Sequence, residues 1–131
     1  MTDSVPAVGT SKQEQVMAAA LVTIGAFQTA LALGAPWGQA AYGGTRHGTL
    51  PNHLRAISGV ASLAYGSSAI LIMRGSGTPR ARSRAYTALS ALMGIGVIAN
   101  AASRSPVERA IWTPVTAATA VLAWRSRTAR A

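Results

Sequence analysis

Side chains that could bind a ligand are concentrated in the stretch 34–55, which lies between two long apolar runs. This stretch contains both histidines of the chain together with arginines, a tryptophan and a tyrosine, and a second polar group follows near residues 100–112. Aromatic rings and guanidinium groups together suit an anionic or amphipathic molecule, such as a lipid headgroup. The alternative is that they serve only as interfacial anchors and loop caps. The candidate ligand-binding residues are Trp37, Tyr42, Arg46, His47, His53, Arg55, Asn100, Arg104, Glu108 and Trp112.

Catalytic and metal-binding chemistry has little support in the same residues. No pattern supplies a nucleophile, a base and an orienting group, and the one aspartate is Asp3, far along the chain from both histidines. His47 and His53 lie six residues apart in a loop, and a zinc site would need a third ligand, for which only Glu108 is available. The chain has no cysteine, which excludes disulfides and thiol chemistry. We therefore predict no catalytic residue, no metal and no cofactor.

Charge is scarce and unevenly placed, because only 11% of the residues are charged, whereas an ordinary soluble domain has about 25%. Twelve lysines and arginines stand against three acids, and the formal net charge is +9. The charges are confined to connections between charge-free windows, whereas a nucleic-acid module would place them along a helix face. We therefore predict an all-α fold, a four-helix transmembrane bundle, with no nucleic-acid partner. The four windows lie between Glu14 and Arg46, Arg55 and Arg74, Arg84 and Arg104, and Arg109 and Arg125.

The sequence leaves two alternatives to this interpretation open. The windows are rich in Ala rather than Leu, so a soluble four-helix bundle is a rival, although its helices would need a charged face toward water. The first apolar run could also be a cleaved signal peptide, because Ala30, Leu31 and Ala32 resemble a cleavage pattern. Against a signal peptide, Lys12 is the only basic residue that precedes the run.

The predicted membrane domain covers residues 1–131 in an up-down arrangement that follows a polar tail, 1–15. Eight of the twelve lysines and arginines fall on the side that holds both termini and the second connection, and four fall on the other side. The positive-inside rule therefore places both termini in the cytoplasm, with Tyr86 and Trp124 near the inner interface. The predicted spans are 16–34, 56–73, 85–102 and 108–124, joined by an outer loop 35–55, a basic cytoplasmic loop 74–84 and a tight turn 103–107.

Glu108 is the one acid that this topology places near the bilayer. Ser105, Pro106 and Glu108 match a helix start with a capping box, and the alternative is that Glu108 carries a proton or pairs with a nearby arginine. The absence of an acid deep in a span weighs against proton-coupled transport. Gln28 and Tyr65 are the larger polar groups inside the spans, and both are expected to face the interior, where hydrogen bonds can satisfy them. Pro114 predicts a kink in the fourth span.

Three groups of residues carry a resemblance to known proteins. They are GAPWG at 34–38, GG-x3-G-x-LP-x3-R from Gly43 to Arg55, and N-x3-SP-x-ER-x2-W from Asn100 to Trp112. The pattern resembles small four-span bacterial integral membrane proteins of unassigned function, over most of residues 34–115. The resemblance implies a four-span fold and no known activity, so it transfers no catalytic residue.

These observations favour a non-enzymatic, multi-pass protein of the plasma (inner) membrane. We expect it to bind a small or lipid-like ligand, or a partner membrane protein, through its outer loop surface. The alternative is a small transporter or channel subunit that forms a homo-oligomer. An enzyme ranks third, and it would have to use His47 or His53 as its base.

Overall fold

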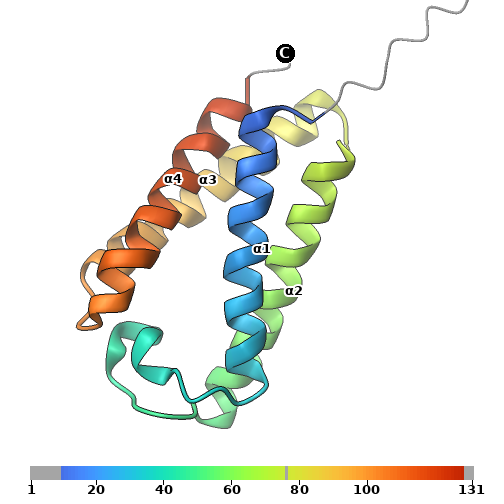
Figure 1. Cartoon of the computed structure of the whole chain (residues 1–131). Helices are drawn as coiled ribbons and strands as arrows, with labels where there is room; N and C mark the ends of the chain where they lie inside the picture. The colour runs from blue at the N-terminus through green and yellow to red at the C-terminus, as the bar shows by residue number, and fades with distance from the viewer. Residues whose placement is uncertain (1–9, 76, 129–131) are drawn as a thin grey trace, which may run out of the picture.

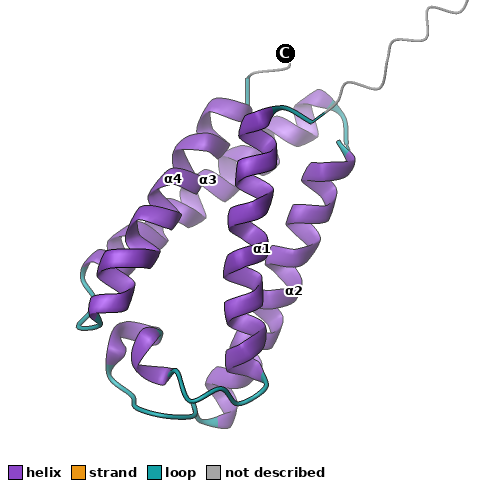
Figure 2. Ribbon diagram, in the orientation of Figure 1, coloured by secondary structure: helices purple, strands orange, loops and turns teal. Residues whose placement is uncertain are grey.

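The computed structural model describes residues 10–75 and 77–128, and these residues confirm the all-α prediction. Four long helices carry the fold: α1 (Lys12–Ala32), α2 (Asn52–Arg74), α3 (Pro79–Ala101) and α4 (Thr113–Ser126). Two short 3₁₀ helices, η1 (Gly38–Ala40) and η2 (Tyr42–Gly44), lie in the first connection, and a π-helical segment, η3 (Glu108–Trp112), precedes α4. The described residues contain no strand (Figure 2).

The helices form two hairpins, α1 with α2 and α3 with α4, and each hairpin packs more extensively within itself than against the other. Between the hairpins, α1 and α4 make the most extensive helix–helix contact. The two ends of the described chain lie together at one end of the bundle, with the α2–α3 connection (Figure 1). The long α1–α2 loop and the α3–α4 turn lie together at the opposite end, which is therefore called the loop end.

The first helix begins earlier than predicted, so the assignment of residues 12–15 to a polar tail is wrong. The cause is a capping box: the Ser11 Oγ accepts a hydrogen bond from the Glu14 amide, and the Glu14 carboxylate accepts one from the Ser11 amide, both at 3.2 Å. This arrangement satisfies two of the amide donors that a helix start leaves free. Residues 1–9 of the predicted tail lie outside the described residues.

The start of the fourth helix is irregular. The chain becomes helical at Pro106, and the Thr113 amide donates to the Glu108 carbonyl in the five-residue spacing of a π helix. Pro114 follows directly and has no amide hydrogen to donate. The π segment therefore lies just before Pro114, the residue at which the sequence predicts a kink. Such segments frequently occur at functional sites.

The buried core is small and divided between the two ends. Near the termini it contains Met17 and Leu21 of α1 with Ile72 of α2, and near the loop end it contains Leu31 and Leu50. Large apolar side chains between these ends are exposed, which is unusual for a water-soluble surface. The most exposed of them are Val60, Leu63, Ile95 and Ile98, at 65 to 72%.

Within the described residues, α1 and α2 are the two helices long and apolar enough to cross a membrane. Only 17% of the apolar window of α2 is buried inside the structure, and 33% of that of α1. A core helix of a soluble protein passes the same test of length and hydropathy, but it is mostly buried.

Candidate functional site

A cavity of about 250 Å³ lies between the two hairpins near the loop end. Residues of α1, α2, α3, η2, η3 and α4 line it, so every major element contributes. Apolar side chains such as Ile24, Phe27 and Met93 form part of its wall. The cavity brings together four of the ten predicted ligand-binding residues and both polar residues predicted inside the spans: Tyr42, Asn100, Glu108, Trp112, Gln28 and Tyr65.

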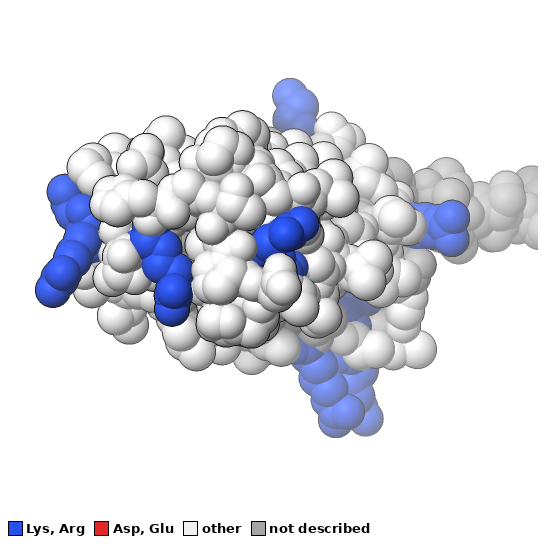
Figure 3. Space-filling model, turned by 90° about the horizontal axis from the view of Figure 1, so that it is seen from below, with Lys and Arg blue, Asp and Glu red and all other residues white. Residues whose placement is uncertain are grey.

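The other predicted residues lie elsewhere at the loop end. Arg46, His47, His53 and Arg104 are exposed, and the surface of this end shows arginines separated by uncharged residues, with no acidic side chain visible (Figure 3). Arg55 has a local role, because its Nε donates to the Ala32 carbonyl at 3.1 Å. A cation there also complements the negative end of the α1 dipole.

Trp37 lies at the rim of this region, and it connects to the cavity through a residue that sequence reasoning missed. The Phe27 ring stacks on Trp37 at a centroid distance of 6.1 Å and contacts Trp112 at 4.8 Å. Phe27 has no polar group, so its residue type did not suggest a role in binding. The only indication in the sequence was its position directly before Gln28. Phe27 and Trp112 form an aromatic side of the cavity, and Trp37 continues the row of rings outside it.

The α1–α2 loop closes the cavity by docking on the α3–α4 turn. The Gly43 amide donates to the Glu108 carboxylate at 3.1 Å, and the Arg104 amide donates to the Gly43 carbonyl at 3.2 Å. A Cβ added to Gly44 would lie 2.8 Å from Ser105 atoms, so only glycine permits this approach. Tyr42, beside them, is the non-glycine residue with a positive φ, 49°, among those described. Such a conformation costs about 1–3 kcal/mol and is held in place by its surroundings.

Glu108 is only 6% exposed, and its carboxylate is held by neutral groups. Its Oε2 accepts hydrogen bonds from the Gly43 amide and the Ser103 hydroxyl. Half of the predicted capping box forms, because the Ser105 Oγ accepts from the Glu108 amide at 3.3 Å, while the Ser105 amide donates to Ser103. Within 10–75 and 77–128, the one ion pair is elsewhere, between Glu14 and Arg82. Among the described residues, Glu108 therefore has no basic nitrogen within 4 Å of its carboxylate.

Two other groups lining the cavity are buried without a hydrogen-bond partner, Gln28 Oε1 and Trp112 Nε1. One is an acceptor and the other is a donor, and each unsatisfied buried group costs about 1–3 kcal/mol. In the cavity wall, the Asn100 Nδ2 donates to the Thr116 Oγ1 at 3.5 Å. The Tyr42 hydroxyl lies 2.8 Å from the Ser58 Oγ. The cavity thus presents unused donor and acceptor capacity beside aromatic rings.

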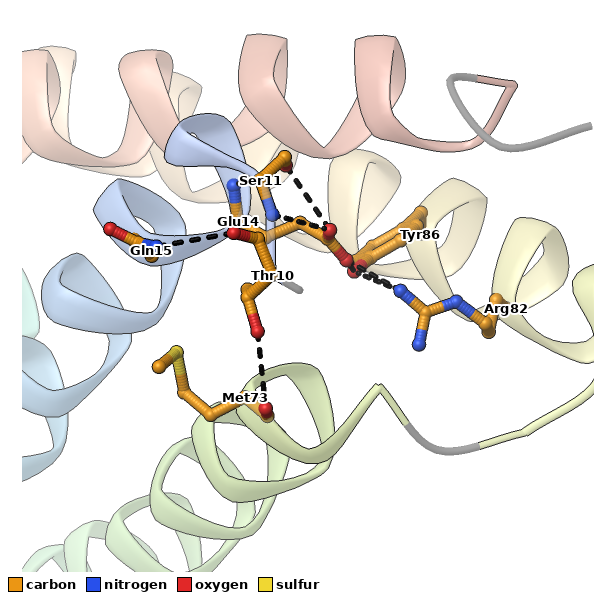
Figure 4. Close-up of polar contacts among 7 residues, drawn as sticks. All are labelled: Thr10, Ser11, Glu14, Gln15, Met73, Arg82 and Tyr86. Carbon is orange, nitrogen blue, oxygen red and sulfur yellow. Dashed lines mark hydrogen bonds and ion pairs between the residues drawn. The ribbon is translucent and has the colours of Figure 1, made fainter. Parts of the chain in front are cut away.

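A second buried carboxylate, Glu14, lies at the opposite end of the bundle and was missed by the sequence analysis (Figure 4). It is 2% exposed, its Oε2 lies 2.5 Å from the Arg82 guanidinium, and the Tyr86 hydroxyl donates to the same atom at 2.5 Å. Tyr86 is 5% exposed, so it is buried within the terminal end of the bundle. The signal was Ser11-x-x-Glu14, the same spacing as Ser105-x-x-Glu108.

No group of three His, Cys, Asp or Glu residues that could hold a metal ion occurs among the described residues. His47 contacts Gln39, with 3.3 Å between the Nδ1 and the Oε1. Comparison of the chain with protein-family models, with curated proteins and with solved structures found no match. The resemblance to small four-span bacterial proteins thus stays an expectation, and the functional argument depends on the site itself.

Proposed function

We propose that this chain is a four-span membrane protein that binds a small ligand in the cavity between its hairpins. The support for a membrane setting is the exposed apolar surface between two arginine-bearing ends. In water, the exposed Leu63 and Ile98 side chains, each at 72%, would be costly. In a bilayer they would face lipid, and the backbone groups of the helices would be satisfied internally. α3 and α4 do not meet the length and hydropathy criterion, but they pack against each other and also expose large apolar side chains: Leu92, Ile95 and Ile98 on α3, and Val121 and Trp124 on α4.

The proposed orientation places both termini in the cytoplasm and the loop end outside, because lysine and arginine are more numerous beside the termini. Thr45 and Thr128 are exposed at opposite ends of the bundle. Since the chain has no cysteine, Thr45→Cys in intact cells should react with a membrane-impermeant thiol reagent, and Thr128→Cys should react only after lysis. The opposite pattern would invert the orientation, and reaction of both in intact cells would contradict the three spans proposed between the two positions.

The observation that carries the binding proposal is the cavity itself, with Gln28 Oε1 and Trp112 Nε1 buried and unpartnered in its wall. Buried polar groups are normally hydrogen-bonded, and a pocket with a few converging polar groups in apolar surroundings is the usual form of a small-molecule site. A ligand in this cavity could supply the missing partners. This refines the expectation of an outer loop surface, because the loop closes over the cavity.

Native mass spectrometry of gently extracted protein should detect a co-purifying small mass, and a pair of glycine variants tests where it binds. A Cβ at Gly96, in the cavity wall, would contact Thr116 at 3.5 Å, whereas at Gly94 it would meet open space. Gly96→Leu should fill the cavity and abolish the retained mass, and Gly94→Leu should keep it. Retention by both variants, or by neither, would contradict binding in this cavity.

Transport is the second candidate function, and the separate packing of the two hairpins favours it. Each hairpin is a compact unit, and polar clusters join the two units at both ends. A ligand-binding cavity between two such units is a common arrangement in transporters. If flux of the retained ligand into proteoliposomes occurs, Gln28→Leu should reduce it. Binding without flux would leave the protein a binding protein alone.

A further inference from the structure

We propose that the ligand of the cavity is a small organic amine, bound as an ammonium ion beside Glu108. This inference rests on the proposed function and specifies the chemical class that the site takes. It starts from the contrast between the carboxylate and its surroundings. Glu108 is 6% exposed, lines the cavity and has only neutral hydrogen-bond donors, the Gly43 amide and the Ser103 hydroxyl.

The other polar groups of the cavity wall also fit an ammonium ion. An ammonium group has three N–H donors and no acceptor, and the wall offers it the Glu108 carboxylate and the unpartnered Gln28 Oε1. The rings of Phe27, Tyr42 and Trp112 line the same space. Aromatic faces attract cations, most strongly where water is excluded. An anion would face the carboxylate at close range, and a neutral molecule would leave the carboxylate without a counter-charge.

The arginines at the loop end do not cancel this preference. Arg46, Arg104 and Arg109 are exposed, and the high dielectric constant of water weakens the electrostatic interactions of exposed charges. The buried carboxylate acts at short range and is screened much less. The Arg109 guanidinium donates to the Ser103 carbonyl at 2.7 Å and forms no ion pair with Glu108. An ammonium ion bound in the cavity could therefore contact Glu108 more closely than any of these arginines does.

The size of the cavity restricts the amine. At about 250 Å³ it lies below the range of about 300–1,000 Å³ that is typical of pockets for drug-sized ligands. One aromatic ring or a short alkyl group with an ammonium head fits this space. The free Trp112 Nε1–H favours amines that also contain a hydroxyl or ether oxygen, since such an oxygen can accept the donor.

Three probes of nearly equal size separate charge from shape: 2-phenylethylamine, 2-phenylethanol and phenylacetate. The protein would be studied in nanodiscs in a background of Trp37→Phe and Trp124→Phe, which leaves Trp112 as the single tryptophan. Quenching or a spectral shift of Trp112 fluorescence then reports binding inside the cavity. The amine should bind saturably and at least about tenfold more tightly than the alcohol, and phenylacetate should bind most weakly.

Glu108→Gln should reduce amine affinity to that of the alcohol and leave alcohol affinity unchanged. Ser103→Ala is the matched control, because it removes a hydrogen bond from the same carboxylate but keeps its charge, and it should retain the preference for the amine. Saturable binding of the alcohol equal to that of the amine would overturn the ammonium proposal and leave the proposed function standing. Saturable binding of none of the probes would overturn both. The comparison of probes on the parent protein decides the class even if Glu108→Gln fails to fold.

Discussion

The two ends of the bundle use the same four-residue pattern for different purposes. Ser11-x-x-Glu14 begins α1 and Ser105-x-x-Glu108 begins the fourth helix, and in each the serine hydroxyl accepts the glutamate amide. At the terminal end the carboxylate is paired with the Arg82 guanidinium and bonded to the Tyr86 hydroxyl. At the loop end the carboxylate receives only neutral donors.

This difference separates a structural charge from one that is available for binding. Glu14 joins α1 to α3, and its charge is neutralised where the two hairpins meet. Glu108 joins the α1–α2 loop to the α3–α4 turn through Gly43, and its carboxylate forms no ion pair beside the cavity. Removing a member of a buried ion pair leaves a buried charge behind, whereas neutralising a lone carboxylate removes a charge that had no partner. The following predictions test this distinction by measuring free energies of unfolding.

Glu14→Gln should have the largest effect, a loss of about 3 kcal/mol in the free energy of unfolding, since it removes the carboxylate charge from a largely buried ion pair and keeps the positive charge of Arg82. The Arg82 side chain is 14% exposed, so water can reach it in part, and the loss should fall at the low end of the usual range. Denaturation of the purified protein in mixed micelles with increasing SDS measures this change.

The matched control for this prediction replaces both partners. Glu14→Leu combined with Arg82→Leu removes the ion pair without leaving a buried charge, so it should be more stable than Glu14→Gln alone. If the double variant were as unstable as the single variant, the loss of stability in Glu14→Gln would not come from breaking the ion pair.

Gly44→Ala should have the next largest effect, about 2–3 kcal/mol, because the added methyl group meets Ser105 at 2.8 Å and the residue has a φ of +71°. Gly43→Ala has a similar φ, +82°, but nothing lies within 4 Å of its Cβ. It should therefore cost only about 1–2 kcal/mol, the penalty of the left-handed conformation alone. Thermal unfolding of the two variants measures the difference. Equal losses of stability in Gly44→Ala and Gly43→Ala would mean that the α1–α2 loop does not dock on the α3–α4 turn as described.

Glu108→Gln should cost only about 1 kcal/mol, because a glutamine oxygen can still accept from the Gly43 amide and the Ser103 hydroxyl. The comparison with Glu14→Gln, under the same denaturation conditions, is the direct test of the difference between the two ends. A loss as large as that of Glu14→Gln would show that the Glu108 carboxylate stabilises the fold as strongly as the Glu14 carboxylate does. It would contradict the view that the charge of Glu108 is not needed for folding.

Sequence patterns predicted the helices well because the charge-free windows and the capping residues are local signals. The all-α fold and the approximate positions of the helices follow from them, and the structure mainly extends their N-terminal ends, as at Ser11 and at Thr78, whose Oγ1 accepts the Ala81 amide. The partner of a buried acid is not a local signal. Arg82 lies 68 residues from Glu14, so only the packing of the two hairpins against each other could reveal the pair.

The site was predicted in part for the same reason. Tyr42, Asn100, Glu108 and Trp112 were identified by residue type, and Gln28 and Tyr65 by their polarity inside apolar runs, but their meeting in one cavity depends on how two hairpins pack. Proximity in the sequence also placed the exposed histidines in the site, although loop residues a few positions apart can point to opposite sides of a closed loop. Residue type and spacing identified the candidate residues, and tertiary packing decides which of them line the cavity.

The smallest effects should come from the two histidines, which lie outside the cavity. His47→Gln and His53→Gln should each change the free energy of unfolding by less than about 0.5 kcal/mol, since both side chains are exposed and substitutions at such positions are usually neutral. They should also leave the quenching of Trp112 by 2-phenylethylamine unchanged, because neither histidine lines the cavity. Weaker binding in a normally folded His47→Gln or His53→Gln variant would extend the site onto the outer loop surface. It would also make that histidine a candidate base, and the search for a catalysed reaction would then begin with it.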